Sequence, residues 1–541
     1  MINKNLALPV ALLTGSMIGP TSYAHAQSDN NRPNILLILC DDMGYSDIGC
    51  YGSEINTPNL DQLASEGIRF TQFYNTARSC PSRASLMTGL HPHETGIGHM
   101  TGGGSKKEAY QGFLNDKCIT LAEVLGASGY TTNMSGKWHM GTEEVAWPYH
   151  RGFQNVYAIH NWVDSYWRVL RGCEVYRNDK LYLSANPPEE ITYRENGSNW
   201  YTTDVFTDEA LKQIESSVAQ NKPFFSYVAY NAPHWPLEAH DSIVDKYIGK
   251  YSNGWEPVMN ARLKRLKDMG IIDKNISIGK QDMVDWNTLS ADDRENLDFR
   301  RAIYAAQVEI LDFNIGRLVA KLKEQGVYEN TVIVFLSDNG CSAEPEDVPF
   351  GYSWEKDRKA NYQEWKRISA RTGASQGKMW SIASDTPFRM YKKFIHEGGI
   401  STPSIISYPS QVKKAGRLEK TPCYLPDIMA TFVDLAGANY PTEFNGHEVR
   451  AMRGRSIVPV IKARKLTPHK IMTWEHEGHG GIRMGDWKLV TEDIMSDEWE
   501  LYNMKVDRTE MNDLSSKNPK KAQELKAVWD KWAREIQVLP K

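Results

Sequence analysis

One stretch of the sequence decides how the rest is organised, and it reads SCPSRASLMTG from Ser79 to Gly89. Pro81 fixes φ and lacks an N–H, so it suits the first position of a helix, and Gly89 is a natural end for that helix. Ser79 then lies at the helix mouth, where free N–H groups and the macrodipole favour an anion, and Arg83 follows at helical spacing. These residues alone predict either a nucleophile or anion site, or an ordinary capped helix.

An apolar run upstream of this stretch ends in two acidic residues. Residues 34–40 read NILLILC and are followed by Asp41 and Asp42. Such a continuous run predicts a buried parallel strand, and open α/β sheets bind ligands at the carboxyl ends of their strands. Two adjacent carboxylates repel each other, and a divalent cation is the simplest way to neutralise them. A solvated loop after the strand is the alternative.

A second apolar run ends in a similar way. Residues 331–336 read TVIVFL and lead into Asp338 and Asn339. With Asp41 and Asp42 these side chains form an all-oxygen set on strands that we expect to be neighbours. Hard oxygen ligands favour Ca²⁺ or Mg²⁺ over zinc. The sequence therefore predicts one divalent cation, Ca²⁺ or Mg²⁺, at this edge of the sheet.

Three further motifs carry basic residues near the ends of expected strands. Lys137 and His139 lie in GKWHMG, and His234 lies in NAPHWP, each after an apolar run. Lys392 stands five residues before the glutamate of an EGG motif. Each of these signals is weak alone, because a surface lysine or a packed loop histidine fits the same pattern.

Together these motifs closely resemble those of the sulfatase family, part of the alkaline-phosphatase superfamily. The family signature is Cys or Ser, any residue, Pro, any residue, Arg, and then Thr-Gly a few positions on. In this chain those places are filled by Ser79, Pro81, Arg83, Thr88 and Gly89. The motifs stand in the family order over nearly all of the chain, and they resemble those of serine-type members and of bacterial arylsulfatases.

The resemblance implies that Ser79 is modified. In the family the first signature residue is oxidised to formylglycine (3-oxoalanine), which is the catalytic nucleophile, by a formylglycine-generating maturation enzyme. Cys80 does not fit, because Pro must lie two places after the converted residue and only Ser79 meets that spacing. The serine version implies a maturation enzyme different from that for cysteine.

The resemblance also implies a site and a mechanism. The implied catalytic residues are Ser79, Arg83, Lys137, His139, His234 and Lys392, and the implied metal ligands are Asp41, Asp42, Asp338, Asn339 and Ser79. Formylglycine is hydrated to a gem-diol, and one hydroxyl, bound to Ca²⁺ and deprotonated with help from Asp338, attacks sulfur in line. The leaving alcohol departs with a proton from His234 or with charge support from Lys392. The second hydroxyl then loses its proton to His139, so that sulfate is expelled.

Two residues near these motifs are candidate contacts to substrate hydroxyls. Arg78 directly precedes the signature, and Glu344 follows the second acidic motif by a few residues. An Arg and a Glu can bracket neighbouring hydroxyls by charge-assisted hydrogen bonds, or they can form a salt bridge at the pocket rim. His476, in WEHEGH, either overhangs the pocket or belongs to a solvated loop. The implied substrate-binding set is Arg78, Lys137, His234, Glu344, Lys392 and His476.

The expected function is hydrolysis of a sulfate ester. A sulfated saccharide is the expected substrate, with galactose sulfate as a candidate, because export favours a polymer or its fragments and an aromatic-rich chain can stack on sugars. The alternatives are an arylsulfatase acting on aryl sulfates, a phosphodiesterase or phosphonate hydrolase of the same superfamily, and an inactive protein that binds sulfated glycans through an unconverted Ser79.

The expected fold is α/β, with a large mixed, mainly parallel sheet sandwiched by helices. Short alternating patterns after residue 463 predict a small C-terminal antiparallel sheet, followed by a helix. We therefore expect a signal peptide over 1–26, a sulfatase catalytic domain over 29–462 and an α+β subdomain over 463–541.

The composition and the N-terminal segment limit which partners and which compartment we expect. A formal net charge of −4 does not favour a polyanion-binding surface, so no nucleic-acid partner is expected. Lys4, a short apolar run and Ala24-His25-Ala26 predict a cleaved export signal. That run is too short for a stable membrane span. We expect a periplasmic or secreted protein, and the seven cysteines show no metal-type spacing.

Overall fold

The computed structural model describes residues 32–538, apart from 103, 104, 106, 164, 186–198, 280, 345–374 and 497. The signal peptide expected over 1–26 lies outside the described residues. Of the helices in this part of the chain, none combines the length and the apolar character that a bilayer crossing requires.

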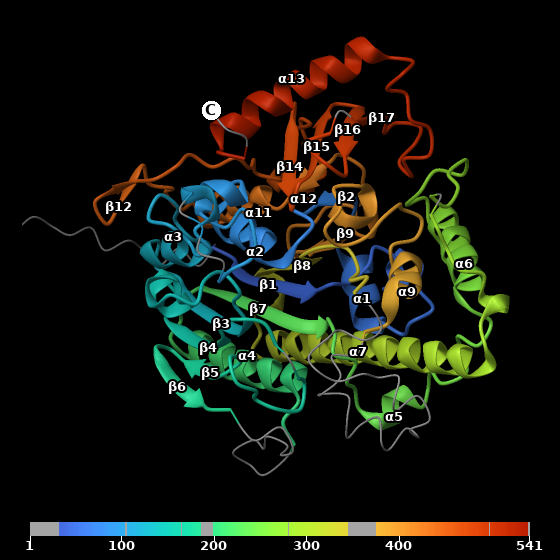
Figure 1. Cartoon of the computed structure of the whole chain (residues 1–541). Coiled ribbons are helices and arrows are strands. Elements are labelled where there is room, and N and C mark those ends of the chain that lie inside the picture. Colours follow the sequence, from blue (N-terminus) through green and yellow to red (C-terminus); the bar gives the residue numbers. More distant parts are fainter. Residues whose placement is uncertain are drawn as a thin grey trace, which may run out of the picture.

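An eleven-stranded mixed sheet forms the centre of the molecule (Figure 1). In spatial order its strands are β10 (Arg417–Glu419), β2 (Ile68–Tyr74), β9 (Ser401–Ser407), β8 (Thr331–Ser337), β1 (Asn34–Asp41), β7 (Phe224–Pro233), β3 (Thr131–Lys137), β4 (Asn155–Ile159), β5 (Val175–Arg177) and β6 (Lys180–Leu183), with β11 (Cys423–Tyr424) on β2. The run from β8 to β4 is parallel, whereas β9 is antiparallel to both β8 and β2. The parallel run brings several strand carboxyl ends to one edge.

The central strand β1 is buried along its whole length. It pairs in parallel with β7 on one side and β8 on the other, and all eight of its residues are buried. Because side chains alternate along a strand, Leu36 and Ile38 join one hydrophobic core while Leu37 and Leu39 join another. The continuous apolar run is thus explained by a parallel strand with both faces covered.

Helices cover both faces of the sheet. One face carries α1 (Pro58–Glu66), α4 (Thr202–Ala219) and α7 (Ala291–Glu324), and the other carries α2 (Ser79–Thr88), α3 (Leu121–Ala127) and α11 (Pro426–Ala436). In Figure 1, α7 and α4 lie below the sheet and α2 and α11 lie above it. Further helices are α5 (Asp241–Val244), α6 (Trp255–Asp268), α9 (Gly377–Ser384), α10 (Glu397–Ile400) and α12 (Val458–Ile461). The 3₁₀ turns are η1 (Gly49–Tyr51), η2 (Pro92–Thr95), η3 (Glu108–Tyr110), η4 (Glu144–Ala146), η5 (Pro148–Arg151), η6 (Trp286–Thr288) and η7 (Tyr328–Asn330).

A small antiparallel sheet follows in the C-terminal part of the chain. Its strands, in order, are β14 (Met472–His476), β15 (His479–Met484), β16 (Trp487–Thr491) and β17 (Glu500–Asn503). The helix α13 (Pro519–Glu535) packs Leu525 and Trp529 against one face of this sheet, and Trp474 on the other face joins Tyr74 of β2. A separate two-stranded ribbon pairs β12 (Glu443–Phe444) with β13 (His447–Glu448). The fold class predicted from the sequence is confirmed.

The helix α2 differs from the prediction at its first turn. It begins at Ser79, with Arg78 at the N-cap, so Pro81 occupies the third position rather than the first. A proline is tolerated there because the N–H groups of the first turn have no partner within the helix. The helix ends as predicted at Gly89, whose φ of 71° is left-handed.

Candidate active site

The carboxyl ends of β1 and β8 place four oxygen-bearing side chains at one edge of the sheet. Asp41 ends β1 and Asp42 follows it, while Asp338 and Asn339 come directly after β8. All four are at most 1% exposed. Asp42 has a φ of 64°, a left-handed conformation that Asp adopts more readily than most residues. The structure thus brings together the four residues that the sequence analysis assigned to a metal.

Ser79 lies directly beside these carboxylates. Its Oγ lies 3.1 Å from Asp41 Oδ1 and within hydrogen-bonding distance of Asp338 Oδ2, and its one proton can be donated to either carboxylate. Arg83, one helical turn later, places Nε 3.3 Å from Ser79 Oγ and pairs through Nη2 with Asp338 at 2.9 Å and with Asp41 at 3.3 Å. We call Ser79, Arg83, Asp41 and Asp338 the nucleophile cluster. Every member is held by at least two charged or polar contacts.

Two lysines and a histidine complete the inner shell. Lys137 Nζ lies 2.5 Å from Asp41 Oδ2. Lys392 Nζ lies 2.8 Å from Asp42 Oδ2, and His234 Nε2 lies 3.3 Å from the same oxygen. Both lysines are at most 5% exposed. The cations therefore converge on one place at the edge of the sheet, where they can stabilise a negatively charged group.

Lys392, and not Lys393, makes this contact. Lys393 has a φ of 85°, and its backbone N–H donates to Ala77 O at 2.9 Å. The structure therefore agrees with the spacing from the EGG motif, which selected Lys392.

The buried carboxylates perturb one another. Burial acts to raise the pKa of Asp41, but the Lys137 ammonium and neighbouring cations hold it well below its usual range. Burial, followed by the negative charge of Asp41, raises the pKa of Asp338 to about 7. Acidic groups that oppose each other's ionisation in this way are stabilised by an additional cation.

Asn339 shows that the site fits an oxygen-coordinated metal. Its Nδ2 donates to Asp42 Oδ1 at 2.6 Å, whereas its Oδ1 is buried and makes no hydrogen bond to any described residue. A buried amide oxygen without a partner is costly, and it is also a suitable ligand atom for Ca²⁺ or Mg²⁺. The donor set of three carboxylates and one amide is that of a hard divalent cation.

Two buried histidines flank the cluster. His139 has a φ of 57°, and neither of its ring nitrogens makes a hydrogen bond within the described part of the chain. Burial, with Lys137 nearby, holds the pKa of His139 well below its usual value. Burial lowers the pKa of His234 to about 4. His234 Nδ1 lies 2.5 Å from Trp235 O, so Nδ1 carries the proton in the neutral ring and Nε2 faces the acidic residues.

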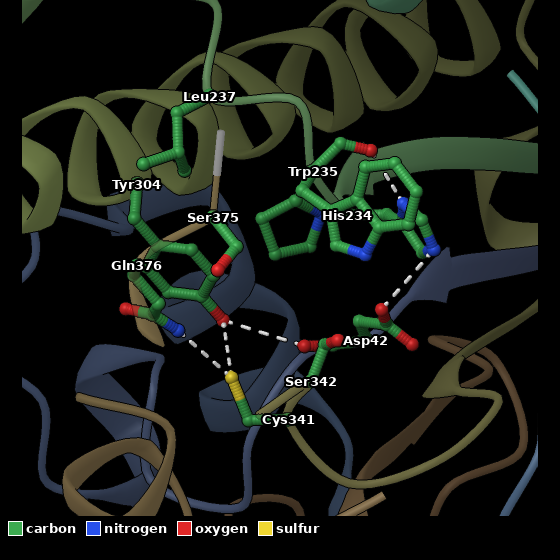
Figure 2. A pocket seen from close by; sticks show the side chains of 10 residues that line it. Asp42, His234, Trp235, Leu237, Tyr304, Cys341, Ser342, Ser375 and Gln376 are labelled. Atoms are coloured by element: carbon green, nitrogen blue, oxygen red, sulfur yellow. Dashed lines mark hydrogen bonds and ion pairs between the residues drawn. The ribbon is translucent and has the colours of Figure 1, made fainter. Parts of the chain in front are cut away.

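A small pocket of about 10 Å³ opens beside Asp42 and His234. Figure 2 shows these two side chains facing each other on one side of the pocket, with Tyr304, Gln376 and Cys341 on the other. The lining residues are Asp42, Pro233, His234, Trp235, Leu237, Tyr304, Cys341, Ser342, Ser375 and Gln376. The pocket has room for about one water molecule beside Asp42 and His234.

The remaining predicted contacts lie around Arg78. Its Nη1 forms an ion pair with Glu344 Oε1 at 3.8 Å, which is the salt bridge that the sequence analysis left open. His476 ends β14 and its side chain is fully buried. Arg78 acts electrostatically on His476. The structure therefore brings all three residues near the N-cap of α2.

Sequence reasoning missed the residues that hold His234 in place. Tyr166 OH donates to His234 O at 2.8 Å. Glu238 Oε2 in turn accepts from Tyr166 N at 2.6 Å and from Ser165 Oγ at 2.9 Å. Tyr166 and Ser165 come from an irregular segment between β4 and β5, where no motif or periodicity marks them.

Comparison with known proteins agrees with this geometry. Residues 33–438 match the family described as Sulfatase, and residues 388–537 match the family described as N-sulphoglucosamine sulphohydrolase, C-terminal. An uncharacterized sulfatase of Schizosaccharomyces pombe is 32% identical over 537 residues, covering 93% of this chain and 94% of the relative. An arylsulfatase of Klebsiella aerogenes is 31% identical over 459 residues, covering 82% and 94%.

A solved structure shows the same architecture. The crystal structure of Ps i-CgsB in complex with k-i-k-neocarrahexaose has a TM-score of 0.64 and 27% sequence identity, covering 93% of this chain and 92% of that one. The chain therefore belongs to the sulfatase family, and it is a sulfate-ester hydrolase.

Proposed function

We propose that this chain removes sulfate from a sulfated carbohydrate through a formylglycine formed at Ser79, with one bound Ca²⁺. The observation that carries the proposal is the position of Ser79 Oγ at the N-terminus of α2, between Asp41, Asp338 and Arg83. A side chain in that position is within reach of the metal ligands and of the cations that would bind a sulfate group.

Asp41, Asp42, Asp338 and Asn339 are the residues that would hold the cation, with residue 79 as a further ligand. Ca²⁺ suits this all-oxygen set, and Mg²⁺ is the alternative. When bound, the cation supplies Lewis-acid stabilisation of negative charge on the sulfate group. The unpartnered Oδ1 of Asn339 supports this assignment.

Conversion of Ser79 would require a maturation enzyme specific for the serine motif. Once formed, formylglycine supplies a hydrated aldehyde that can both attack the ester and release sulfate. Cys80 is a poor candidate for this role, because its side chain joins the hydrophobic core and its Sγ lies 3.9 Å from Thr101 Oγ1, whereas Ser79 Oγ contacts the carboxylates. Burial also raises the pKa of Cys80.

The surrounding side chains have distinct roles in this proposal. Arg83, Lys137 and Lys392 bind and stabilise the charge of the transferring group. The Lys392 ammonium and His234 Nε2 both lie at Asp42. Lys392 is placed to support the departing alcohol oxygen with its charge, and His234 can donate a proton there from its protonated form, because Nδ1 carries the proton of the neutral ring. His139 accepts a proton at one of its ring nitrogens, which have no partner of their own.

Two observations favour a carbohydrate substrate. The similar structure of Ps i-CgsB contains an oligosaccharide, and the Arg78–Glu344 pair lies next to the nucleophile, where the two side chains can bracket hydroxyl groups. Galactose sulfate remains the candidate sugar. Export to the periplasm or the medium after cleavage at residue 26 would give the enzyme access to such glycans.

Substrate comparison tests the proposal. The purified enzyme is assayed on sulfated monosaccharides, an aryl sulfate and an aryl phosphodiester, with Arg78→Ala and Glu344→Ala alongside. We expect each variant to lose about tenfold or more in kcat/KM on the sugar, with a much smaller loss on the aryl ester. Equal losses on both substrates would assign Arg78 and Glu344 to chemistry or fold. An enzyme that cleaves aryl sulfates but no sulfated sugar would contradict the carbohydrate proposal, and a preference for the phosphodiester would contradict the proposed reaction.

A further inference from the structure

A second polar cluster lies beside Arg78 and is formed by His99, His476 and Glu477, which we call the hairpin cluster. One ligand atom from each of the three side chains lies within 4.8 Å of the others. The rings of His99 and His476 meet edge to face with centroids 5.4 Å apart. His476 and Glu477 come from the end of β14 and the turn that follows, far in sequence from the nucleophile cluster.

His476 is buried without a satisfied ring. Its side chain is 0% exposed, and neither ring nitrogen makes a hydrogen bond to a described residue. Glu477 Oε1 stands 3.4 Å from Nε2 as an ion-pair contact. Buried polar groups in folded proteins are almost always hydrogen-bonded. Nδ1 therefore has no partner among the described residues and Nε2 has only the long contact to Glu477, so the ring can still bond a ligand.

Glu477 occupies a backbone position that does not suit it. Glu477 and Gly478 form the two-residue turn between β14 and β15, with φ values of 50° and 84°. Such a turn favours Asn, Asp or Gly at its first position, and a larger side chain there is strained. A glutamate in this place indicates that its carboxylate has a use beyond forming the turn.

Arg78 connects this cluster to the nucleophile. It is the N-cap of α2, directly before Ser79. Burial lowers the pKa of His476 and the contact with His476 lowers the pKa of Glu477, and the positive charge of Arg78 acts on both in the same direction. Arg78 Nε also lies 3.4 Å from Met100 Sδ. The hairpin cluster therefore borders the entrance to the catalytic residues.

The hydrogen-bonding chemistry favours hydroxyl groups over a metal ion. The backbone N–H of Met100 donates to His99 Nδ1 at 2.6 Å, so the neutral ring carries its proton on Nε2 and presents a donor there. Glu477 presents an acceptor, and neutral His476 presents one donor and one acceptor. A cation would need a free lone pair on His99 Nε2, whereas sugar hydroxyls match donors and acceptors together.

We propose that His99, His476 and Glu477 bind two neighbouring free hydroxyls of the sugar residue that carries the sulfate ester, and so select which sugar is cleaved; this rests on the proposed function. Arg78 and Glu344 then contact the same sugar from the side of α2 and the loop after β8. The small C-terminal sheet supplies part of the substrate site rather than only packing against the main sheet.

The substitution Glu477→Asn separates recognition from structure. Asn suits the left-handed turn position, so the variant should unfold at the same temperature as the wild type or a higher one. We expect kcat/KM on the sulfated sugar to fall about tenfold more than kcat/KM on a small aryl sulfate. His476→Asn should likewise lower the ratio of kcat/KM on the sulfated sugar to kcat/KM on the aryl sulfate. Glu498→Asn, which removes an exposed acid elsewhere in the small subdomain, is the matched control and should leave both values unchanged.

Three outcomes would overturn the inference. In the first, the enzyme cleaves sulfated sugars while Glu477→Asn and His476→Asn keep the wild-type ratio of kcat/KM on the sugar to kcat/KM on the aryl sulfate. That result removes the recognition role and leaves the proposed function standing. A wild type that cleaves aryl sulfates only removes the carbohydrate proposal and this inference together. In the third, metal analysis finds one equivalent of zinc, in addition to the proposed calcium, in the wild type but not in His476→Asn. That result would assign the hairpin cluster to a cation instead.

Discussion

The nucleophile cluster and the hairpin cluster differ in how completely their buried polar groups are hydrogen-bonded. At the nucleophile cluster, Ser79 Oγ meets two carboxylates and the Arg83 guanidinium, and Arg83 is paired twice. At the hairpin cluster, the buried His476 ring has no hydrogen bond in the described structure. One group is already held in place by the protein, and the other has bonding capacity left for a ligand.

The difference follows from where the residues come from. The first group lies on the ends of parallel strands and on the first turns of α2, which the two hydrophobic cores hold rigidly. The second comes from a loop and a hairpin of the small C-terminal sheet. Sites that carry chemistry need a preorganised frame, whereas loops are where binding residues commonly vary. Substitutions in the nucleophile cluster should abolish turnover. Substitutions in the hairpin cluster should change the relative turnover of different substrates.

The largest effect is expected at Ser79. Ser79→Ala should lower turnover by on the order of 10³-fold or more, because it removes the residue that becomes the nucleophile. The fold should remain, since Arg78 and not Ser79 is the N-cap and no side chain caps the helix. Cys80→Ala is the matched control at the next position, and it should keep most activity while losing about 1 kcal/mol of stability from a small core cavity. If Cys80 proved essential and Ser79 dispensable, Cys80 would be the converted residue and the assignment of the whole motif would move by one residue.

The next largest effect is expected at the metal ligands. Asp338→Asn removes one negative charge from the set, so Ca²⁺ affinity should fall about tenfold or more, and activity should fall roughly 100-fold. Metal analysis of the purified protein and calcium titration measure this.

Asp312→Asn is the control for a buried aspartate outside the site. Asp312 accepts from Asn59 N, Asn59 Nδ2 and Leu60 N at the start of α1, so this change should lower stability by about 1–3 kcal/mol without altering calcium binding. Wild-type calcium occupancy and activity in Asp338→Asn would show that the metal assignment is wrong.

A smaller effect is expected at Tyr166, which holds the loop of His234. Tyr166→Phe removes the hydrogen bond to His234 O, and a slight displacement of His234 should lower kcat about three- to tenfold with little change in KM. Tyr230→Phe removes a buried hydroxyl on β7, the strand that precedes His234, and this hydroxyl lies 2.7 Å from Thr207 Oγ1. That control should lose about 1 kcal/mol of stability and keep its kcat. If both variants keep the wild-type kcat, the Tyr166 hydroxyl does not position His234 and Tyr166 is a packing residue only.

The strand-end residues could be predicted because two local rules determine their positions. A buried apolar run predicts a parallel strand, and parallel strands end at the same edge. Asp41, Asp42 and Asp338 lie next to one another for that reason, although almost 300 residues separate the first two from the third. Lys392 could be distinguished from Lys393 only by motif spacing, since both are lysines in the same loop.

The entrance residues could not be predicted to the same depth. Whether Arg78 and Glu344 form an ion pair depends on how two loops meet, and the sequence left both readings open; the structure shows the pair at 3.8 Å. Tyr166 and Glu477 act through contacts between distant segments and carry no periodic signal. The first turn of α2 was also misplaced, because its N-cap is an arginine without a capping side chain rather than a residue type that marks a helix start.

Mass spectrometry of the peptide that spans Ser79 tests the central claim most directly. The enzyme is isolated from a host that carries the serine-specific maturation system, and its activity on a sulfate ester is measured on the same preparation. The account predicts that part of the peptide is lighter by two hydrogens at Ser79 and that specific activity rises with this fraction. Full activity in a preparation whose residue 79 is entirely unmodified serine would contradict it.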